Sequence, residues 1–276
     1  NVLRETRSER RPATIAHVIH PAALAGQRLV IDGLGMVTHN IRHTGLASSL
    51  ERQSKIALSE RTSRTVWVND DFEALIEMVT PAVRLLVFGA GDDAIPVTEL
   101  AKYLGWQVWV FDGRSHYARR EKFPHADAVV VRPAGKAHAI AEMNHIAKTN
   151  PIAEIDPWTA AVLMSHSYSQ DLDTLRELAG TALSYLGVLG PRKRTLQLLS
   201  DAGLDASTLG PTLHSPMGLD IGADGPEQVA LAVIAEIQAA LNGRTGGLLR
   251  GRIGSIHSCA ETLADPEGSW VQPSCA

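Results

Sequence analysis

Hydrophobic positions follow one pattern in the first part of the chain and another in the rest. Up to about residue 80, short apolar runs alternate with turn residues, a spacing typical of short strands (Pro21, Gly26, Gly33 and Gly35 between Thr14 and Val37). Two later stretches, residues 49–61 and 70–79, are predicted to be helices. The second opens on an Asp cap and has helically spaced apolar positions (Phe72, Leu75, Ile76 and Val79). We therefore expect a small α/β domain over residues 1–80.

From Arg84 onward, continuous apolar runs alternate with amphipathic helical stretches. The runs are RLLVFGA, WQVWVFD, DAVVVRP, TAAVLMSHS and SYLGVLG. Such strands are typical of a parallel sheet that helices cover on both faces. A last strong helix spans residues 225–243, with Pro226 in its first turn and Gly243 as its stop. We predict an α/β, Rossmann-like domain over residues 81–243 and a C-terminal tail over residues 244–276.

Composition and charge exclude several classes of function. The net charge of −4, with 26 basic and 30 acidic residues, argues against nucleic acid as a partner. No apolar run reaches the roughly 18 residues that a membrane span needs. The N-terminal residues NVLRETRSERR are charged and precede no signal-peptide core, so a cytoplasmic protein is expected. No nucleophile elbow, Walker A sequence or HExxH helix occurs.

Both cysteines, Cys259 and Cys275, lie close to the C-terminal end of the sequence. This placement does not indicate a structural disulfide framework. Two free thiols on a loose tail are the simpler interpretation, and a sulfur-handling role is the alternative.

The stretch GAGDDA, residues 89–94, has the form G-x-G-x-x-A and lies between an expected strand and an expected helix. In a dinucleotide site, Gly89 would permit the tight turn and Gly91 would let the backbone approach a pyrophosphate. Asp92 and Asp93 suit the helix dipole, but they compete with a phosphate for the same N–H groups. The motif predicts a nucleotide-binding Rossmann fold, with a degenerate site of the same fold as the alternative.

The next strand ends in Asp112, where a carboxylate can accept hydrogen bonds from a ribose. Arg114 follows two residues later and could meet a 2′-phosphate, so the choice between NAD and NADP stays open. A solvated arginine at the end of a strand is the alternative for Arg114.

Ligands of open parallel sheets bind at the carboxyl ends of the strands, so the residues just after each strand are candidates. His166 and Asp171 follow the fourth strand and could form an acid–base pair or supply two metal ligands. A zinc site needs three or four ligands, and no second His or Cys lies nearby, so no metal site is predicted. A hydrogen-bonded histidine that fixes the loop is the alternative.

Three cations, Arg192, Lys193 and Arg194, follow Gly190 at the end of the fifth strand. They suit an anionic ligand, and a solvated basic helix start is the alternative. The glycine- and proline-rich loop before the last helix offers His214 and Asp220 as polar candidates, although an ordinary loop has the same composition.

These motifs, in this order, resemble those of the xanthine dehydrogenase accessory protein family, XdhC or CoxI. The similarity covers about residues 84–257 and is carried by GAGDDAIPVTELAKYLGWQVWVFDGR, REKFPHADAVVV, VLMSHSYSQDLDTL, YLGVLGPRKR, LHSPMGLDIGADGPEQVALAVIAEI and LLRGRIGSIH. RPATIAHVIHPAALAGQRLVIDGLGMV is more weakly similar to the family's smaller domain.

The resemblance implies a cytoplasmic maturation factor rather than an enzyme. Such a factor binds molybdenum cofactor of the molybdopterin type, protects its sulfurated form and delivers it to an apo molybdenum hydroxylase of the xanthine or carbon monoxide dehydrogenase type. A homodimer, and a sulfur-donating desulfurase as a second partner, are further expectations. The residues themselves leave two alternatives: an NAD(P)-dependent oxidoreductase and a non-catalytic nucleotide sensor.

The candidate site residues fall into two groups. His166 and Asp171 are the candidate catalytic pair. The candidate cofactor-binding residues are Gly89, Gly91, Asp112, Arg114, His166, Gly190, Arg192, Arg194 and Asp220.

Two departures from the family pattern change these expectations. Many members carry Gly-Gly-Cys in the small domain, whereas HTGLASSLE in this chain has no cysteine, which argues against a thiol-based step there. Tyr168 stands where many members have a histidine, which argues further against a metal site.

Overall fold

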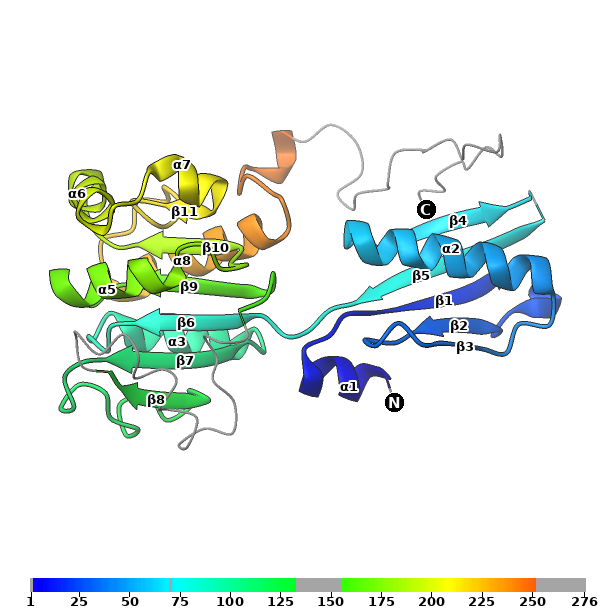
Figure 1. The fold of residues 1–276 in the computed structure, drawn as a ribbon, viewed down its shortest axis with the longest axis horizontal. Helices are drawn as coiled ribbons and strands as arrows, with labels where there is room; N and C mark the ends of the chain where they lie inside the picture. The colour runs from blue at the N-terminus through cyan, green and yellow to red at the C-terminus, as the bar shows by residue number, and fades with distance from the viewer. Residues whose placement is uncertain (1, 70, 133–154, 252–276) are drawn as a thin grey trace. The chain divides into compact units, whose positions relative to one another are not determined.

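The computed structural model describes residues 2–69, 71–132 and 155–251, so Cys259 and Cys275 lie outside the described part (Figure 1). The chain divides into two compact units. The first consists of residues 1–81 together with the segment that begins at Leu248, and the second spans Ala82–Gly247.

The first unit is an antiparallel sheet with one long helix on it. The strand order is β3-β2-β1-β5-β4, and α2 packs against β1, β2, β4 and β5. Its elements are α1 (Val2–Glu9), β1 (Ala13–His20), η1 (Ala22–Leu24), β2 (Arg28–Ile31), β3 (Val37–His39), α2 (Thr44–Glu60), β4 (Arg64–Val68) and β5 (Phe72–Val79). Ala16 in the central strand lies opposite Leu29 on one side and Ile76 on the other, and all three belong to the core under α2.

The helix predicted over residues 70–79 is wrong, because β5 occupies Phe72–Val79. Apolar residues in this stretch satisfy both periods, and the tertiary structure selects the period of two. Ala74 and Ile76 are fully buried on the face toward α2, while Glu77 on the opposite face is exposed. Pairing with β1 on one side and β4 on the other satisfies the backbone of the strand.

The second unit is a six-stranded parallel sheet in the order β8-β7-β6-β9-β10-β11. Numbered within this unit, the order is 3-2-1-4-5-6, that of a Rossmann fold. Its elements are β6 (Arg84–Phe88), α3 (Ala94–Tyr103), β7 (Gln107–Asp112), β8 (Ala128–Val131), β9 (Thr159–Leu163), α5 (Tyr168–Leu178), β10 (Tyr185–Val188), α6 (Arg192–Ala202), α7 (Ala206–Leu209), η3 (Gly210–Thr212), β11 (Leu213–His214) and α8 (Pro226–Leu241). A short helix, η4 (Leu249–Gly251), follows in the first unit.

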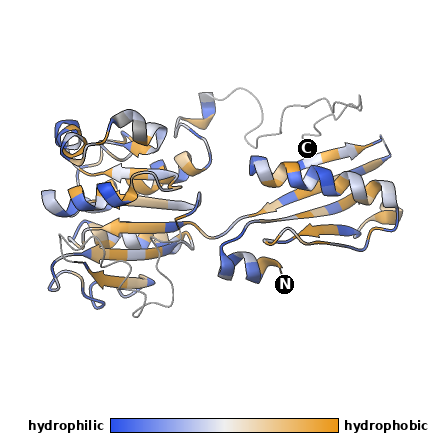
Figure 2. Ribbon diagram, viewed as in Figure 1, coloured by the Kyte–Doolittle hydropathy of each residue, from blue (hydrophilic) through white to orange (hydrophobic). Residues whose placement is uncertain are grey.

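Side chains of the central strand alternate between two cores. Leu85 and Val87 belong to the core that includes α3 and α8, and Leu86 and Phe88 to the core that includes α5 and α6. All four are buried, which explains why the sequence of the strand is continuously apolar (Figure 2). The predicted α/β class, with helices on both faces of a parallel sheet after a smaller unit, is confirmed.

The last predicted helix is also confirmed, since α8 spans Pro226–Leu241 with Pro226 in its first turn. The sixth strand, β11, was not predicted, because two residues are too few to give a periodic pattern. Among the described residues, no helix combines the length and apolarity needed to cross a bilayer.

Gly89 permits a close approach of the backbones that follow the two central strands, β6 and β9. Its φ is +125°, and a Cβ added there would lie 2.4 Å from the carbonyl oxygen of Met164 and 2.7 Å from the Cα of Ser165. Since both contacts are with backbone after β9, relief would require the strands to separate. Gly89 is therefore required by the fold itself, whatever ligand the turn binds.

We expect Gly89→Ala to lower the free energy of unfolding by more than about 3 kcal/mol, since it adds a backbone clash to the cost of a positive φ. Gly105→Ala is the matched control: Gly105 also has a positive φ, of +78°, but nothing lies within 4 Å of an added Cβ. It should cost only about 1–2 kcal/mol. Urea denaturation measures both variants, and equal losses would show that the approach of the strands is not limiting.

Candidate functional site

The candidate site lies at the carboxyl edge of the parallel sheet. The strand order reverses between β6 and β9, which is where open α/β sheets bind ligands. The turn after β6 carries Gly89 and Gly91, the turn after β9 carries His166, and the turn after β10 carries Gly190. The sequence-predicted residues are thus brought to one edge, but their individual partners differ from expectation.

Asp112 at the end of β7 faces into the protein. Its side chain is fully buried, and its carboxylate accepts hydrogen bonds from the N–H of Ala90 in the glycine turn and from the N–H of Arg114, both at 2.9 Å. The Arg114 guanidinium donates to both carboxylate oxygens, also at 2.9 Å. The ribose-binding role predicted for Asp112 stays a prediction, and the partners observed give this residue a structural role.

Burial opposes ionisation of Asp112, but the hydrogen bonds from Arg114 and Ala90 outweigh it and lower the pKa of the carboxyl. The same pair raises the pKa of the Arg114 guanidinium. Arg114, predicted to meet a 2′-phosphate, is thus committed to Asp112, and its guanidinium also lies 4.0 Å from the ring centroid of Tyr117.

Lys122 is a site residue that the sequence analysis missed. Its ammonium lies 2.7 Å from the carbonyl oxygen of Ala90 and 2.8 Å from Oδ1 of Asp92, and its side chain is only 13% exposed. A hydrogen bond from Lys122 lowers the pKa of Asp92. Lys122 is 30 residues from Asp92 in sequence, in a long connection after β7, so no spacing rule could have indicated this contact.

His166 projects from the turn after β9 with its side chain 66% exposed. Its φ of +54° is unusual for a residue other than glycine, and such backbone conformations concentrate at functional sites. Its Nε2 lies 3.2 Å from Oδ2 of Asp93, at the start of α3. The pair spans the point where the strand order reverses, because α3 follows β6 and His166 follows β9.

The acid–base pair of His166 and Asp171 stays a prediction, and the structure gives each of the two residues a different partner. Asp171 is buried and accepts a hydrogen bond from Ser165 Oγ at 2.5 Å and an ion pair from Arg194 at 2.7 Å. Asp171 is the fourth residue of α5, and its two carboxylate oxygens contact different elements, Oδ1 the turn after β9 and Oδ2 the helix α6. Asp171 therefore holds two elements together, while Asp93 takes its place beside His166.

The three cations that follow β10 differ in their surroundings: one forms an ion pair and two are exposed. Arg194 is committed to Asp171, whereas the side chains of Arg192 and Lys193 are exposed at the first turn of α6. Gly190 precedes them with a φ of +105°, in a turn where an added Cβ would meet only Arg194 at 3.9 Å. Two of the three predicted cations are thus available to an anionic ligand.

Glu236 of α8 fixes the loop between β11 and α8 through hydrogen bonds and an ion pair. Oε2 of Glu236 accepts hydrogen bonds from the hydroxyl of Tyr185 at 2.6 Å and from the N–H of Gly218 at 2.7 Å. Oε1 lies 3.2 Å from Nδ1 of His214, whose ring stacks on Tyr185. His214 thus belongs to the support of the loop, while Asp220 is exposed on it.

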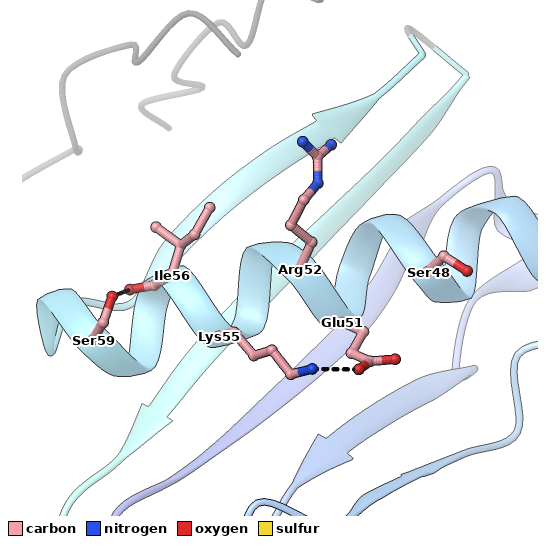
Figure 3. A pocket seen from close by; sticks show the side chains of 6 residues that line it. All are labelled: Ser48, Glu51, Arg52, Lys55, Ile56 and Ser59. Atoms are coloured by element: carbon pink, nitrogen blue, oxygen red, sulfur yellow. Dashed lines mark hydrogen bonds and ion pairs between the residues drawn. The ribbon is translucent and has the colours of Figure 1, made fainter. Parts of the chain in front are cut away.

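Among the residues that the structure describes, no three His, Cys, Asp or Glu side chains are grouped to hold a metal ion. A hollow in the first unit is lined by Ser48, Glu51, Arg52, Lys55, Ile56 and Ser59, all from α2 (Figure 3). Within it, Lys55 pairs with Glu51 at 2.6 Å, a spacing of one helical turn. Its polar groups come from a single helix, so the carboxyl edge of the second unit is the stronger candidate.

We expect Arg194→Ala to lower the free energy of unfolding by about 2–3 kcal/mol, because it leaves the buried Asp171 carboxylate without its charge partner. Arg192→Ala is the matched control, since it removes an exposed cation from the same turn, and it should change stability by less than about 0.5 kcal/mol. Chemical denaturation of both variants measures the difference. A small effect of Arg194→Ala would mean that the ion pair does not hold α5 to α6.

The lowered pKa of Asp112 predicts a pH dependence of stability. A lowered folded-state pKa contributes stability above the unfolded value of about 3.9, and this contribution is lost as pH falls through the folded-state pKa. Asp112→Asn should therefore flatten the fall in the free energy of unfolding between about pH 5 and about pH 2. Urea denaturation across this range tests it, and parallel curves for parent and variant would contradict it.

Comparison with known proteins identifies relatives of this chain. A sequence profile described as the XdhC Rossmann domain matches residues 85–237. A protein of Bacillus subtilis (strain 168), named as a probable xanthine dehydrogenase subunit, is 35% identical over 162 residues, 59% of this chain and 44% of that protein. The molybdenum cofactor insertion chaperone PaoD of Escherichia coli (strain K12) is 27% identical over 195 residues, 70% of this chain and 50% of that protein. The chain thus spans half or less of the length of these relatives.

A solved structure agrees on the fold. The crystal structure of a protein from Bacillus halodurans, titled as a xanthine dehydrogenase, superposes with a TM-score of 0.51 at 18% identity, covering 88% of this chain and 95% of that one. At this identity the likeness concerns the fold alone. The sequence profile covers more than half of the chain, including all but the first residue of β6, the strands β7 to β11 and most of α8. The chain belongs to the XdhC Rossmann domain family, as the sequence motifs predicted.

Proposed function

We propose that this protein binds molybdenum cofactor at the carboxyl edge of its parallel sheet and delivers it to an apo molybdenum hydroxylase. Family membership supports the proposal, together with the relative named as a molybdenum cofactor insertion chaperone. In this proposal the cofactor is a cargo, and the protein is a maturation factor. The recipient enzyme, a desulfurase as sulfur donor and self-association as a homodimer belong to the same proposal.

The observation that carries the proposal is the basic start of α6. Arg192 and Lys193 are exposed in the first turn of this helix, where the helix dipole disfavours positive charge. A bound anion would relieve this repulsion and would also accept hydrogen bonds from the free backbone N–H groups of the turn. The terminal phosphate of a molybdopterin fits this combination, since arginine can donate two parallel hydrogen bonds to phosphate oxygens.

The rest of the cofactor would lie along the edge between the turn of His166 and the loop of Asp220. The turns after β9 and β10 are neighbours, because these strands pair in the sheet. His166 offers an exposed imidazole and Asp220 an exposed carboxylate, both of which can hydrogen-bond a polar pterin ring. Glu236 fixes the Asp220 loop through Gly218, so its role is to position that loop.

We expect Arg192→Ala to weaken binding of molybdenum cofactor at least about tenfold, which corresponds to about 1.4 kcal/mol for a charge-assisted contact. Arg244→Ala is the control, because Arg244 is an exposed arginine beyond the far end of α8. Anaerobic titration of the purified protein with the cofactor, followed by transfer to an apo hydroxylase, measures both steps. Equal affinities of the two variants would place the phosphate elsewhere, and no saturable binding by the parent would refute the proposed function.

The second candidate function is binding of NAD or NADP, with or without hydride transfer. It is favoured by the Rossmann strand order and by Gly89 and Gly91 after the first strand of the sheet. His166 would be the acid–base group of an oxidoreductase of this kind. The geometry of the glycine turn bears directly on this candidate.

A further inference from the structure

The glycine turn of a dinucleotide site needs free space above its second glycine, so that a pyrophosphate can approach the backbone. In this protein a side chain of the turn occupies that space. A Cβ added to Gly91 would lie 2.5 Å from Oδ1 of Asp93. Oδ1 of Asp93 therefore occupies the space beside Gly91 that a pyrophosphate would need.

Asp93 is held in this position by His166, from the turn after β9. Its Oδ2 lies 3.2 Å from Nε2 of His166, and its side chain is only 22% exposed. Its Oδ1 is buried and has no hydrogen-bond partner among the described residues. The Asp93 side chain makes no capping hydrogen bond to the start of α3, so Oδ1 faces the turn unpaired. A phosphate entering the turn would have to displace this carboxylate.

Two backbone N–H groups at the start of the turn are also committed internally. The N–H of Ala90 donates to Asp112, and the N–H of Gly89 donates to the carbonyl oxygen of Phe111 at 2.7 Å. The cations nearest the turn are paired with carboxylates, Lys122 with Asp92 and Arg114 with Asp112. A pyrophosphate carries negative charge on each phosphate. In this turn it would meet two acidic residues, and the nearest cations among the described residues are already paired.

We infer that Asp93 is a specificity-determining residue that closes the glycine turn of this Rossmann domain to the pyrophosphate of dinucleotides such as NAD and NADP. Occupation of the turn is both steric, because Oδ1 fills the space above Gly91, and electrostatic, because a carboxylate repels phosphate. The inference goes beyond the proposed function and does not rest on it, since the cofactor phosphate is assigned there to α6. It reverses the role that the sequence motif predicts for this turn.

The test is to replace Asp93 by a small neutral residue and titrate with NAD⁺. Asp93→Ser removes the carboxylate, and because the side chain makes no capping hydrogen bond, the start of α3 should be preserved. The matched control is Asp92→Ser, which removes the same charge from the neighbouring residue, whose side chain is 90% exposed. Calorimetry gives the affinity, and amide shifts at Gly89–Ala94 in ¹H–¹⁵N spectra show whether the ligand lies in the turn.

We expect the parent protein to show no saturable binding of NAD⁺ and no shift at Gly91. Asp92→Ser frees Lys122 but leaves Oδ1 of Asp93 beside Gly91, so it should show at most a weak gain and no shift centred on the turn. Asp93→Ser should bind at least about tenfold more tightly than the parent, with shifts centred on the turn. Binding of NAD⁺ by the parent in the turn would overturn the inference, as would an equal gain in both variants or no gain in Asp93→Ser. If thermal melting shows that Asp93→Ser does not fold, Asp93→Thr replaces it with the same expectations. None of these outcomes bears on binding of molybdenum cofactor, which is measured separately.

Discussion

The close approach of β6 and β9 at Gly89 is the constraint on which the second unit depends. These two strands form the centre of the sheet, and the strand order reverses between them. A Cβ at position 89 would lie 2.4 Å from the carbonyl oxygen of Met164. Only glycine therefore allows the turn after β6 to approach the turn after β9 this closely. Asp93 and His166, which follow β6 and β9, lie beside each other at this point, with 3.2 Å between Oδ2 and Nε2.

Ion pairs at the carboxyl edge of the sheet then determine which charged side chains remain available to a ligand. Asp112 with Arg114 and Asp171 with Arg194 are partly or fully buried. The first pair lies at the end of β7 and in the loop after it, and the second ties α5 to α6. Pairs of this kind stabilise mainly by avoiding an unpaired buried charge, so their members are poor candidates for ligand binding. The exposed groups that remain, His166, Arg192 and Asp220 among them, come from the turns after β9, β10 and β11.

The glycine motif fits a dinucleotide site, but the structure also gives each of its glycines a contact within the protein. The glycines in GAGDDA satisfy two demands of the fold, the approach of β9 at Gly89 and the space taken by Asp93 at Gly91. Neither demand involves a ligand. The same fold can serve a different ligand through the turn after β10, which is consistent with function residing in sites rather than in folds.

The sequence by itself determined the α/β class, the parallel sheet of the second unit, α8 and the membership of the family, because continuous apolar strands and short motifs are local signals. It also located His166, Arg192 and Asp220 at one edge of that sheet, since residues after parallel strands share an edge. Only the tertiary structure decided that residues 72–79 form a strand, because that choice depends on β1 and β4 being available to pair with them. Likewise, the partners of Asp93, Asp112, Asp171 and Lys122 are set by side chains that lie 2 to 73 positions away in sequence. Charge pairing acts through space, so no pattern along the chain could specify it.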